Sequence, residues 1–174
     1  MSLRNHGLLA AGALLVLALA ACGSKESPTA PASGAAQASL VVKDPWVKTA
    51  KSGMSAAYGT VVNPTGKDVV VVSAASAVSA MIELHETTTV DGKMAMRPKE
   101  GGFVIPANGS NEFKPGGDHF MLMDVTTEVK AGDQVTFTLT LQDGGTVRFT
   151  ALGKDFAGGN ESYRPGAPSS MTMG

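Results

Sequence analysis

The sequence predicts an all-β domain, a sandwich of about seven to nine strands, and three features lead to this fold class. Apolar residues between Leu40 and Phe156 recur mainly at every second position, which is the period of a strand and not of a helix. Gly, Pro and Asn interrupt these apolar segments about every ten residues. No stretch between the same two residues carries the apolar stripe of an amphipathic helix.

The clearest pair of strands lies near the end of this region. In residues 135–141, apolar side chains alternate with threonines, as in a strand with one buried face. Asp143-Gly144-Gly145 then turns the chain, and the alternation resumes in residues 146–152. This arrangement predicts a β-hairpin.

Earlier segments follow the same pattern. Residues 69–72 form an uninterrupted valine run, which is typical of a strand buried on both faces. Asp91-Gly92 separates two alternating segments, 81–90 and 93–97, and predicts another hairpin. We expect the single tryptophan, Trp46, to be a core or edge-of-core residue of the first strand; an exposed anchor for a partner is the less favoured interpretation.

The N-terminus has the features of a bacterial lipoprotein signal. Arg4 precedes an apolar run, residues 8–21, that is short for a membrane span and typical of an export signal. The run ends Leu-Ala-Ala-Cys, the pattern of a lipobox. We therefore expect residues 1–21 to be removed and Cys22, the only cysteine, to be lipidated and to anchor an exported protein to a membrane by lipid alone. An ordinary signal peptide and a transmembrane anchor fit this pattern less well.

The rest of the chain divides into three parts by composition. Residues 22–39 are rich in Pro, Ala and Ser and predict a flexible tether, residues 40–157 hold the domain, and residues 158–174 predict a loose tail. Met171 and Met173 in that tail are interpreted as incidental, with weak copper capture as the alternative. A formal net charge of −1 argues against nucleic-acid binding, which needs a clustered basic face.

Histidine and methionine share strand faces that point away from the predicted core. In residues 81–85 the alternation directs Ile82 and Leu84 inward and His85 outward. The same reasoning directs the two apolar residues inside 119–123 inward. The outward-facing residues of the second segment are His119, Met121 and Met123, and Met94 and Met96 share a face of the segment between them.

These side chains predict a copper site close to the protein surface. The four expected ligands are His85, Met96, His119 and Met121, with Met94 and Met123 as auxiliary candidates. Imidazole nitrogen and thioether sulfur without a thiolate suit Cu(I) and suit zinc, magnesium and calcium poorly. Any one methionine alone is better explained as core filling, but the group is not. Neighbouring carboxylates, namely Glu83, Glu86 and Asp118, are candidates for orienting the imidazoles.

The same residues resemble the signature of the periplasmic copper chaperones known as the PCuAC domain. The resemblance comprises His85, Met96 and His119-Phe120-Met121 with the turn residues that flank them, and it extends over about residues 42–152. The interval between Met96 and His119 is one residue longer than the usual family pattern. The resemblance implies a cupredoxin-like β-sandwich that binds one Cu(I) through the four side chains. It further implies delivery to a copper-accepting protein outside the cytoplasm, such as a cytochrome c oxidase subunit or another copper chaperone.

Other functions fit the sequence less well or remain open. A blue-copper electron carrier needs a cysteine thiolate, which the domain lacks. No nucleophile elbow, zinc-protease motif or phosphate loop indicates an enzyme. A structural lipoprotein without a metal role stays an alternative, as does a copper-buffering protein. A surface site without cysteine favours delivery over buffering, because thioether bonds to Cu(I) exchange readily. The acceptor, the oligomeric state and the membrane that holds the lipid remain open.

Overall fold

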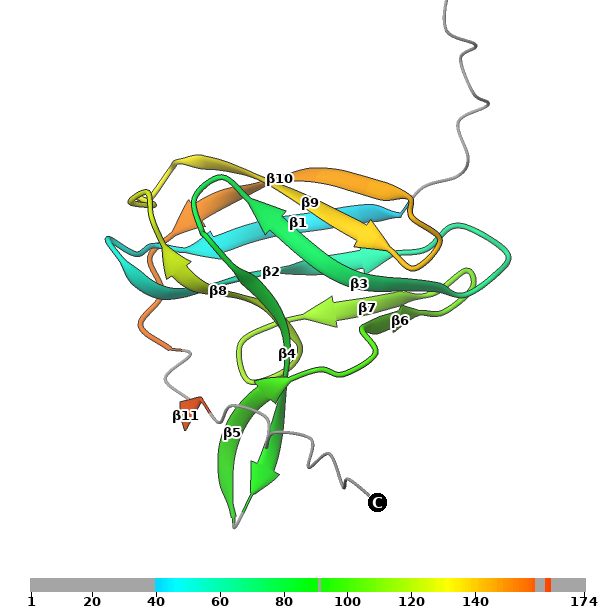
Figure 1. Cartoon of the computed structure of the whole chain (residues 1–174), viewed down its shortest axis with the longest axis horizontal. Coiled ribbons are helices and arrows are strands. Elements are labelled where there is room, and N and C mark those ends of the chain that lie inside the picture. The colour runs from blue at the N-terminus through cyan, green and yellow to red at the C-terminus, as the bar shows by residue number, and fades with distance from the viewer. Residues whose placement is uncertain (1–39, 91, 159–161, 164–174) are drawn as a thin grey trace, which may run out of the picture. The chain divides into compact units, whose positions relative to one another are not determined.

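The computed structural model describes residues 40–90, 92–158 and 162–163, and within them it contains strands and no helix (Figure 1). The strands are β1 (Val41–Lys48), β2 (Gly53–Val62), β3 (Val69–Ser76), β4 (Ile82–Val90), β5 (Lys93–Pro98), β6 (Phe103–Ile105), β7 (Ser110–Phe113), β8 (His119–Val125), β9 (Gln134–Leu141), β10 (Thr146–Lys154) and β11 (Ser162–Tyr163). The all-β class is therefore confirmed. The described strands outnumber the expected range because β6, β7 and β11 are only 3, 4 and 2 residues long.

Several predictions made from the termini concern residues outside this description. The signal peptide, the tether, Cys22 and the methionines of the last residues all lie outside the described residues. Within the described part of the chain, no helix has the length and apolar character that a bilayer span requires.

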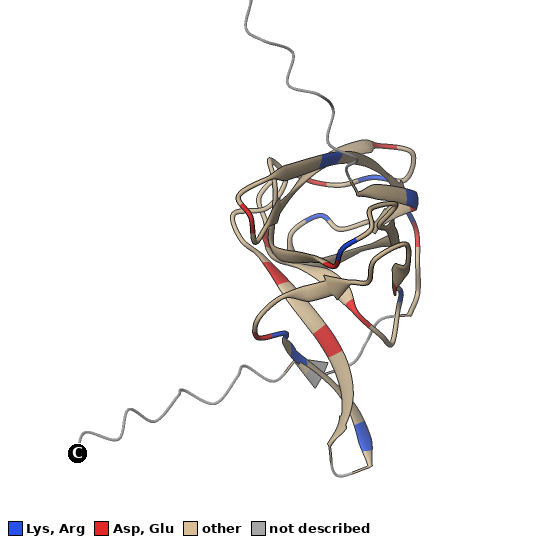
Figure 2. Ribbon diagram, turned by 90° about the vertical axis from the view of Figure 1, so that its right-hand side faces the viewer, with Lys and Arg blue, Asp and Glu red and all other residues tan. Residues whose placement is uncertain are grey.

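The strands form one hydrogen-bonded path that curls around the core. Its order is β11-β5-β4-β8-β2-β1-β10-β9-β3-β6, and β7 pairs with β2 off this path. The path turns back on itself so that β3 packs against β4. In Figure 2 the strands surround the interior, and the β4–β5 hairpin extends away from the body of the domain. β9 and β10 form the predicted hairpin, with Phe137 opposite Phe149.

The main core lies between the curled layers and is built from aromatic and branched side chains. Phe113 and Phe120 stack with ring centroids 4.5 Å apart, and Phe103 meets Phe113 edge-on at 4.9 Å. Leu84 and Leu122 are buried in the same core, as the alternation predicts. Burying each such side chain contributes about 1.5–3 kcal/mol, so this core supplies most of the driving force for folding.

The valine run of β3 differs from its prediction. Val71 is fully buried, but its neighbour Val72 is exposed, so the strand is buried on one face and not on both. The difference arises because β3 belongs to an antiparallel sheet, between β9 and β6, and the face that carries Val72 stays exposed in the described part of the chain.

A β-bulge in β1 sets the position of the tryptophan. Asp44 and Pro45 stand opposite Gly59 on β2, and Asp44 adopts a positive φ of 48°. A β-carbon at Gly59, whose φ is +146°, would lie only 3.1 Å from the Pro45 Cα, so the bulge requires glycine there. Beyond the bulge, Trp46 pairs with Tyr58 and their ring centroids lie 4.4 Å apart. Trp46 is partly buried, which matches the edge-of-core prediction.

Candidate metal centre

The two histidines of the domain face each other across neighbouring strands. β4 and β8 pair antiparallel, and the register places His85 directly opposite His119. Their ring centroids are 5.5 Å apart and the ring planes meet at 68°. Both rings lie on the side of the sheet away from Leu84 and Phe120, as the alternation predicts.

The predicted thioethers gather on the same face. Met121 on β8 stands opposite Glu83, and Met96 on β5 stands opposite Thr87. They pack together with aromatic residues in a second buried group, which we call the methionine–aromatic cluster. The cluster consists of Ala56, Tyr58, Met96 and Met121, with Trp46, Met123 and Tyr163 packed against it. The structure therefore brings the four predicted ligands into one region of the sheet.

The predicted exposure of this region is wrong. His85, His119, Met96 and Met121 are 0%, 4%, 6% and 5% exposed, so the site is not open to solvent. The sequence pattern correctly turned these side chains away from the main core. A second layer of side chains, including Trp46 and Tyr58 from strands distant in the sequence, then covers them.

One nitrogen of His85 has no hydrogen-bond partner. Nε2 lies 2.7 Å from Oε2 of Glu83, and because a carboxylate only accepts, Nε2 is the donor. Nδ1 is buried and makes no hydrogen bond in the structure. When the ring is neutral and Nε2 is its donor, Nδ1 carries the lone pair. Buried polar atoms are nearly always satisfied, so this atom calls for a ligand.

His119 is oriented by the backbone. Its Nδ1 lies 2.9 Å from the carbonyl oxygen of Gly117 and donates to it, which puts the lone pair of the ring on Nε2. The hydroxyl of Thr87 donates to the same carbonyl at 3.0 Å and helps to hold it in place. Each histidine therefore has one nitrogen fixed as a donor, an arrangement common among imidazoles that bind metals.

Of the three carboxylates suggested as orienting groups, only Glu83 contacts an imidazole. Glu86 instead pairs with Lys99 at 2.6 Å and with Arg97 at 2.8 Å. The hydrogen bond from Lys99 is the main reason that the pKa of Glu86 lies below its usual value. Asp118 accepts a hydrogen bond from Asn111 at 3.1 Å.

The two auxiliary candidates behave differently. Met123 is partly buried and packs against the methionine–aromatic cluster. Met94 is 47% exposed, and its sulfur accepts a weak contact from the Thr89 hydroxyl at 3.9 Å. Met94 lies two residues from Met96, nearer the tip of the β4–β5 hairpin, which extends away from the other long strands (Figure 1). Its role as an auxiliary ligand stays a prediction.

Sequence reasoning missed Tyr163. This residue belongs to β11, which pairs with β5 beside Met96, and its ring stacks on His85 at 5.2 Å with an interplanar angle of 8°. Its hydroxyl lies 3.5 Å from Oε2 of Glu83, and burial together with that carboxylate raises the pKa of Tyr163. A two-residue strand, Ser162–Tyr163, thus lies within the segment that was expected to form a loose tail. An aromatic residue within an otherwise small and polar segment was the only available signal.

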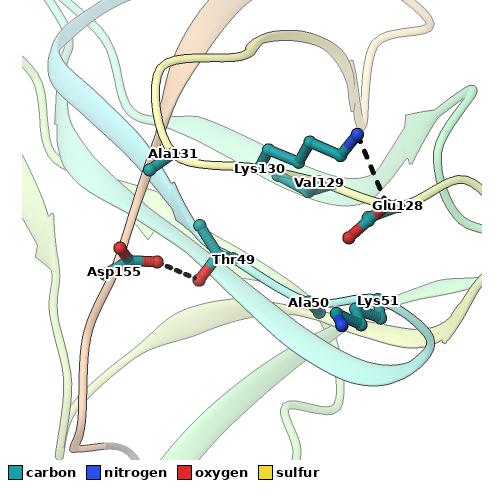
Figure 3. Close-up of a pocket in the computed structure, with 8 residues that line it drawn as sticks. All are labelled: Thr49, Ala50, Lys51, Glu128, Val129, Lys130, Ala131 and Asp155. Atoms are coloured by element: carbon teal, nitrogen blue, oxygen red, sulfur yellow. Dashed lines mark hydrogen bonds and ion pairs between the residues drawn. The ribbon is translucent and has the colours of Figure 1, made fainter.

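A surface pocket elsewhere has the wrong chemistry for soft metals. It has a volume of about 370 Å³ and lies at the Ala50–Val129 bridge between two loops (Figure 3). Four of its polar side chains pair with each other, Thr49 with Asp155 at 2.7 Å and Lys130 with Glu128 at 3.6 Å. It has no imidazole or sulfur in its lining. Among the described residues, no group of three or more His, Cys, Asp or Glu side chains is placed to hold a metal ion.

Comparison with known proteins places the chain in a family. The family model described as "Putative lipoprotein LpqE-like" matches residues 40–152. The chain belongs to the LpqE-like family. The protein named "Putative lipoprotein Lxx21020" of Leifsonia xyli subsp. xyli is 37% identical over 152 residues, which cover 87% of this chain and 92% of the relative. The uncharacterized protein RP573 of Rickettsia prowazekii is 31% identical over 113 residues, 62% of each chain.

Solved structures share the fold. Apo-DR1885 from Deinococcus radiodurans is 27% identical, with a TM-score of 0.54 over 88% of this chain and 98% of that chain. The Cu(I) form of DR1885 is 28% identical, with a TM-score of 0.52 over 71% and 85% of the two chains. The copper-bound PCuAC domain from PmoF2 is 19% identical and shows likeness of fold alone, with a TM-score of 0.56 over 67% and 93%. The cupredoxin-like β-sandwich and the resemblance to PCuAC domains are thus confirmed.

Proposed function

We propose that this protein is an extracytoplasmic copper chaperone that carries one Cu(I) between His85, His119, Met96 and Met121. The ion is cargo that the protein acquires and hands to a copper-accepting protein. Following the family resemblance, that acceptor is a cytochrome c oxidase subunit or another copper chaperone. The names of the Leifsonia relative and of the family model support an exported lipoprotein, with Cys22 as the proposed lipid anchor.

The observation that carries the proposal is the unsatisfied Nδ1 of His85. A fully buried nitrogen without a hydrogen-bond partner destabilises the metal-free protein by about 1–3 kcal/mol. A bound cation would remove that penalty. His119 is the cross-strand neighbour of this ring, and Met96 and Met121 pack in the adjoining cluster.

The donor set explains why copper in its reduced state is the proposed cargo. Thioether sulfur is a soft ligand that stabilises Cu(I), and two imidazoles provide further donors without a charged thiolate. Thioethers and neutral imidazoles leave the positive charge of the ion intact. The Glu83 carboxylate accepts a hydrogen bond from the other nitrogen of His85 and so places a negative charge next to that proposed ligand. The Cu(I) form of DR1885 supports the same cargo.

A second function, copper buffering, is favoured by one observation. The expected preference for delivery depended on a site near the surface, but the proposed ligands are buried. A covered site releases its ion more slowly than an open one, as a storage protein requires. A deletion strain distinguishes the two roles: loss of oxidase activity under copper limitation supports delivery, whereas sensitivity only to excess copper supports buffering.

Cu(I) binding is tested by titrating the full chain anaerobically against the chromophoric chelator bicinchoninate. We expect wild-type protein to bind one Cu(I) tightly and the double variant His119→Asn, Met121→Leu to lose about a hundredfold in affinity, equivalent to ~2.7 kcal/mol. Met94→Leu is the matched control, because it removes a methionine outside the cluster. Equal affinity of the wild type and the double variant would leave the structural lipoprotein as the better interpretation.

A further inference from the structure

Three methionines form a row across the sheet next to the buried site. β4, β8 and β2 are consecutive neighbours in the sheet. Ile82 and Ser55 both pair with Leu122, from the two sides of β8. One position along lie Met81, which directly precedes β4, Met123 on β8 and Met54 on β2. Their side chains therefore share the face opposite that of Leu122, which is the face of the proposed copper site.

Backbone contacts fix the members of this row beside each other. The amide of Met123 donates to the carbonyl of Met81 at 3.0 Å. On the other side, the register between β2 and β8 shifts between Gly53 and Ser55, so Met54 faces a bulge that contains Met123. Neighbouring strands lie about 4.8 Å apart, and a methionine side chain has three rotatable bonds, so the outer two thioethers can both reach the middle one.

The two outer methionines of the row are exposed to solvent, and the middle one contacts the buried cluster. Met54 is 53% exposed and Met81 is 51% exposed, although methionine is usually a core residue. Met123, between them, is partly buried and packs against the cluster that holds Met96 and Met121. Met54 and Met81 are thus two half-exposed methionines on either side of a third, partly buried one.

We propose that Met54, Met81 and Met123 form a second, surface Cu(I) site through which the ion enters and leaves the buried site. Three neutral thioethers match the softness of Cu(I), and they bind it more weakly than a set that includes imidazole. Weak binding suits an exchange point, because the ion must leave it in either direction. Met123 is the proposed connecting ligand, since it lies between the exposed pair in the sheet and packs against the buried cluster.

The surface site rests on the proposed function for the identity of its ligand, Cu(I). The positions of the three methionines do not depend on that function. The surface site also resolves the difficulty that burial of the main site creates for delivery. The exposed pair Met54 and Met81 offers an acceptor protein sulfur-bound copper without unfolding of the covering layer.

The test follows the methyl groups of all 9 methionines of the full chain by NMR while Cu(I) is added anaerobically. We expect the first equivalent to shift the Met96 and Met121 methyls, and the second to shift Met54, Met81 and Met123. In the variant Met54→Leu, Met81→Leu the first response stays and the second is lost, with several-fold slower loading of the buried site. Met94→Leu, a similarly exposed methionine away from the row, leaves both responses unchanged.

The outcomes separate this inference from the proposed function. A second equivalent that shifts no methyl of the row, or only those of Met171 and Met173, overturns the surface site and leaves the buried site standing. Loading of the buried site at the wild-type rate in the double variant also overturns it. A first equivalent that shifts the row but neither Met96 nor Met121 overturns the proposed buried site and supports the row.

Discussion

The two faces of strands β4 and β8 are both buried, yet they are built on different principles. One face packs Leu84, Phe120 and Leu122 into the main core, where every side chain is apolar. The other face packs His85 and His119 beside the methionine–aromatic cluster, with comparable exclusion of solvent. Burial alone therefore does not distinguish the main core from the proposed site in this protein. The two faces differ in the atoms they bury, which are carbon on one face and include nitrogen and sulfur on the other.

The energetic difference between the faces is clearest at their polar atoms. The main core leaves no polar side-chain atom unsatisfied, whereas the second face contains Nδ1 of His85 without a partner. Selection for stability of the metal-free protein alone would replace such an atom by carbon. The proposed role as a copper site explains this second face better than a contribution to stability does.

Truncating the main-core face should have the largest effect. Phe120→Ala removes a ring that is 1% exposed and stacks on Phe113, so we expect a loss of about 3–5 kcal/mol in the free energy of unfolding. Chemical denaturation of the metal-free protein measures this loss. A loss below about 1 kcal/mol would contradict the assignment of this face as the structural core.

The next residue along the chain provides the contrast. Met121→Leu conserves volume, so the free energy of unfolding should change by less than about 1.5 kcal/mol. The same substitution removes a proposed ligand and should weaken Cu(I) binding by about a hundredfold, or ~2.7 kcal/mol, in a chelator competition. Unchanged Cu(I) affinity in Met121→Leu would show that the second face is merely another part of the core.

The sequence predicted the division between the two faces but not the cover over the second one. The alternation around Phe120 assigned each neighbour to the correct side, because a strand allows only two directions for its side chains. Trp46, Tyr58 and Tyr163 reach the site from β1, β2 and β11, and their arrival depends on long-range pairing. No local pattern near the histidines carries that information, so the predicted surface site proved to be buried.

Two further differences between sequence and structure have the same origin. Met94 and Met96 share a strand face by alternation, but only Met96 lies under the covering side chains, since Met94 sits further out on the hairpin. The valine run at 69–72 lost its predicted second buried face because the side of β3 that carries Val72 stays exposed in the described part of the chain. In each case the sequence gives the direction of a side chain, whereas its burial depends on what the rest of the chain places above it.

A smaller effect should follow from changing the residue that orients His85. Glu83→Gln keeps the shape of the side chain but replaces the carboxylate that accepts from Nε2 at 2.7 Å. We expect Cu(I) affinity to fall by about tenfold, or ~1.4 kcal/mol, because the imidazole becomes a weaker donor. Glu86→Gln is the matched control, since Glu86 pairs with Lys99 and contacts no imidazole. Equal losses in the two variants would indicate a general charge effect and not orientation of His85.

The smallest expected effect concerns the metal-free protein, in which replacing His85 and replacing His119 should change the free energy of unfolding in different directions. His85→Leu removes the unsatisfied Nδ1 and frees a carboxylate that is 26% exposed and therefore accessible to water, so the free energy of unfolding should rise or stay constant, by up to about 1 kcal/mol. His119→Leu removes the hydrogen bond to Gly117 and should lower the same quantity by about 1 kcal/mol. Denaturation of both variants without copper measures the contrast. Adding Cu(I) should then stabilise wild-type protein and neither variant, because a ligand raises stability only where the native state binds it. If metal-free His85→Leu loses as much stability as His119→Leu, the unsatisfied nitrogen of His85 does not destabilise the metal-free protein.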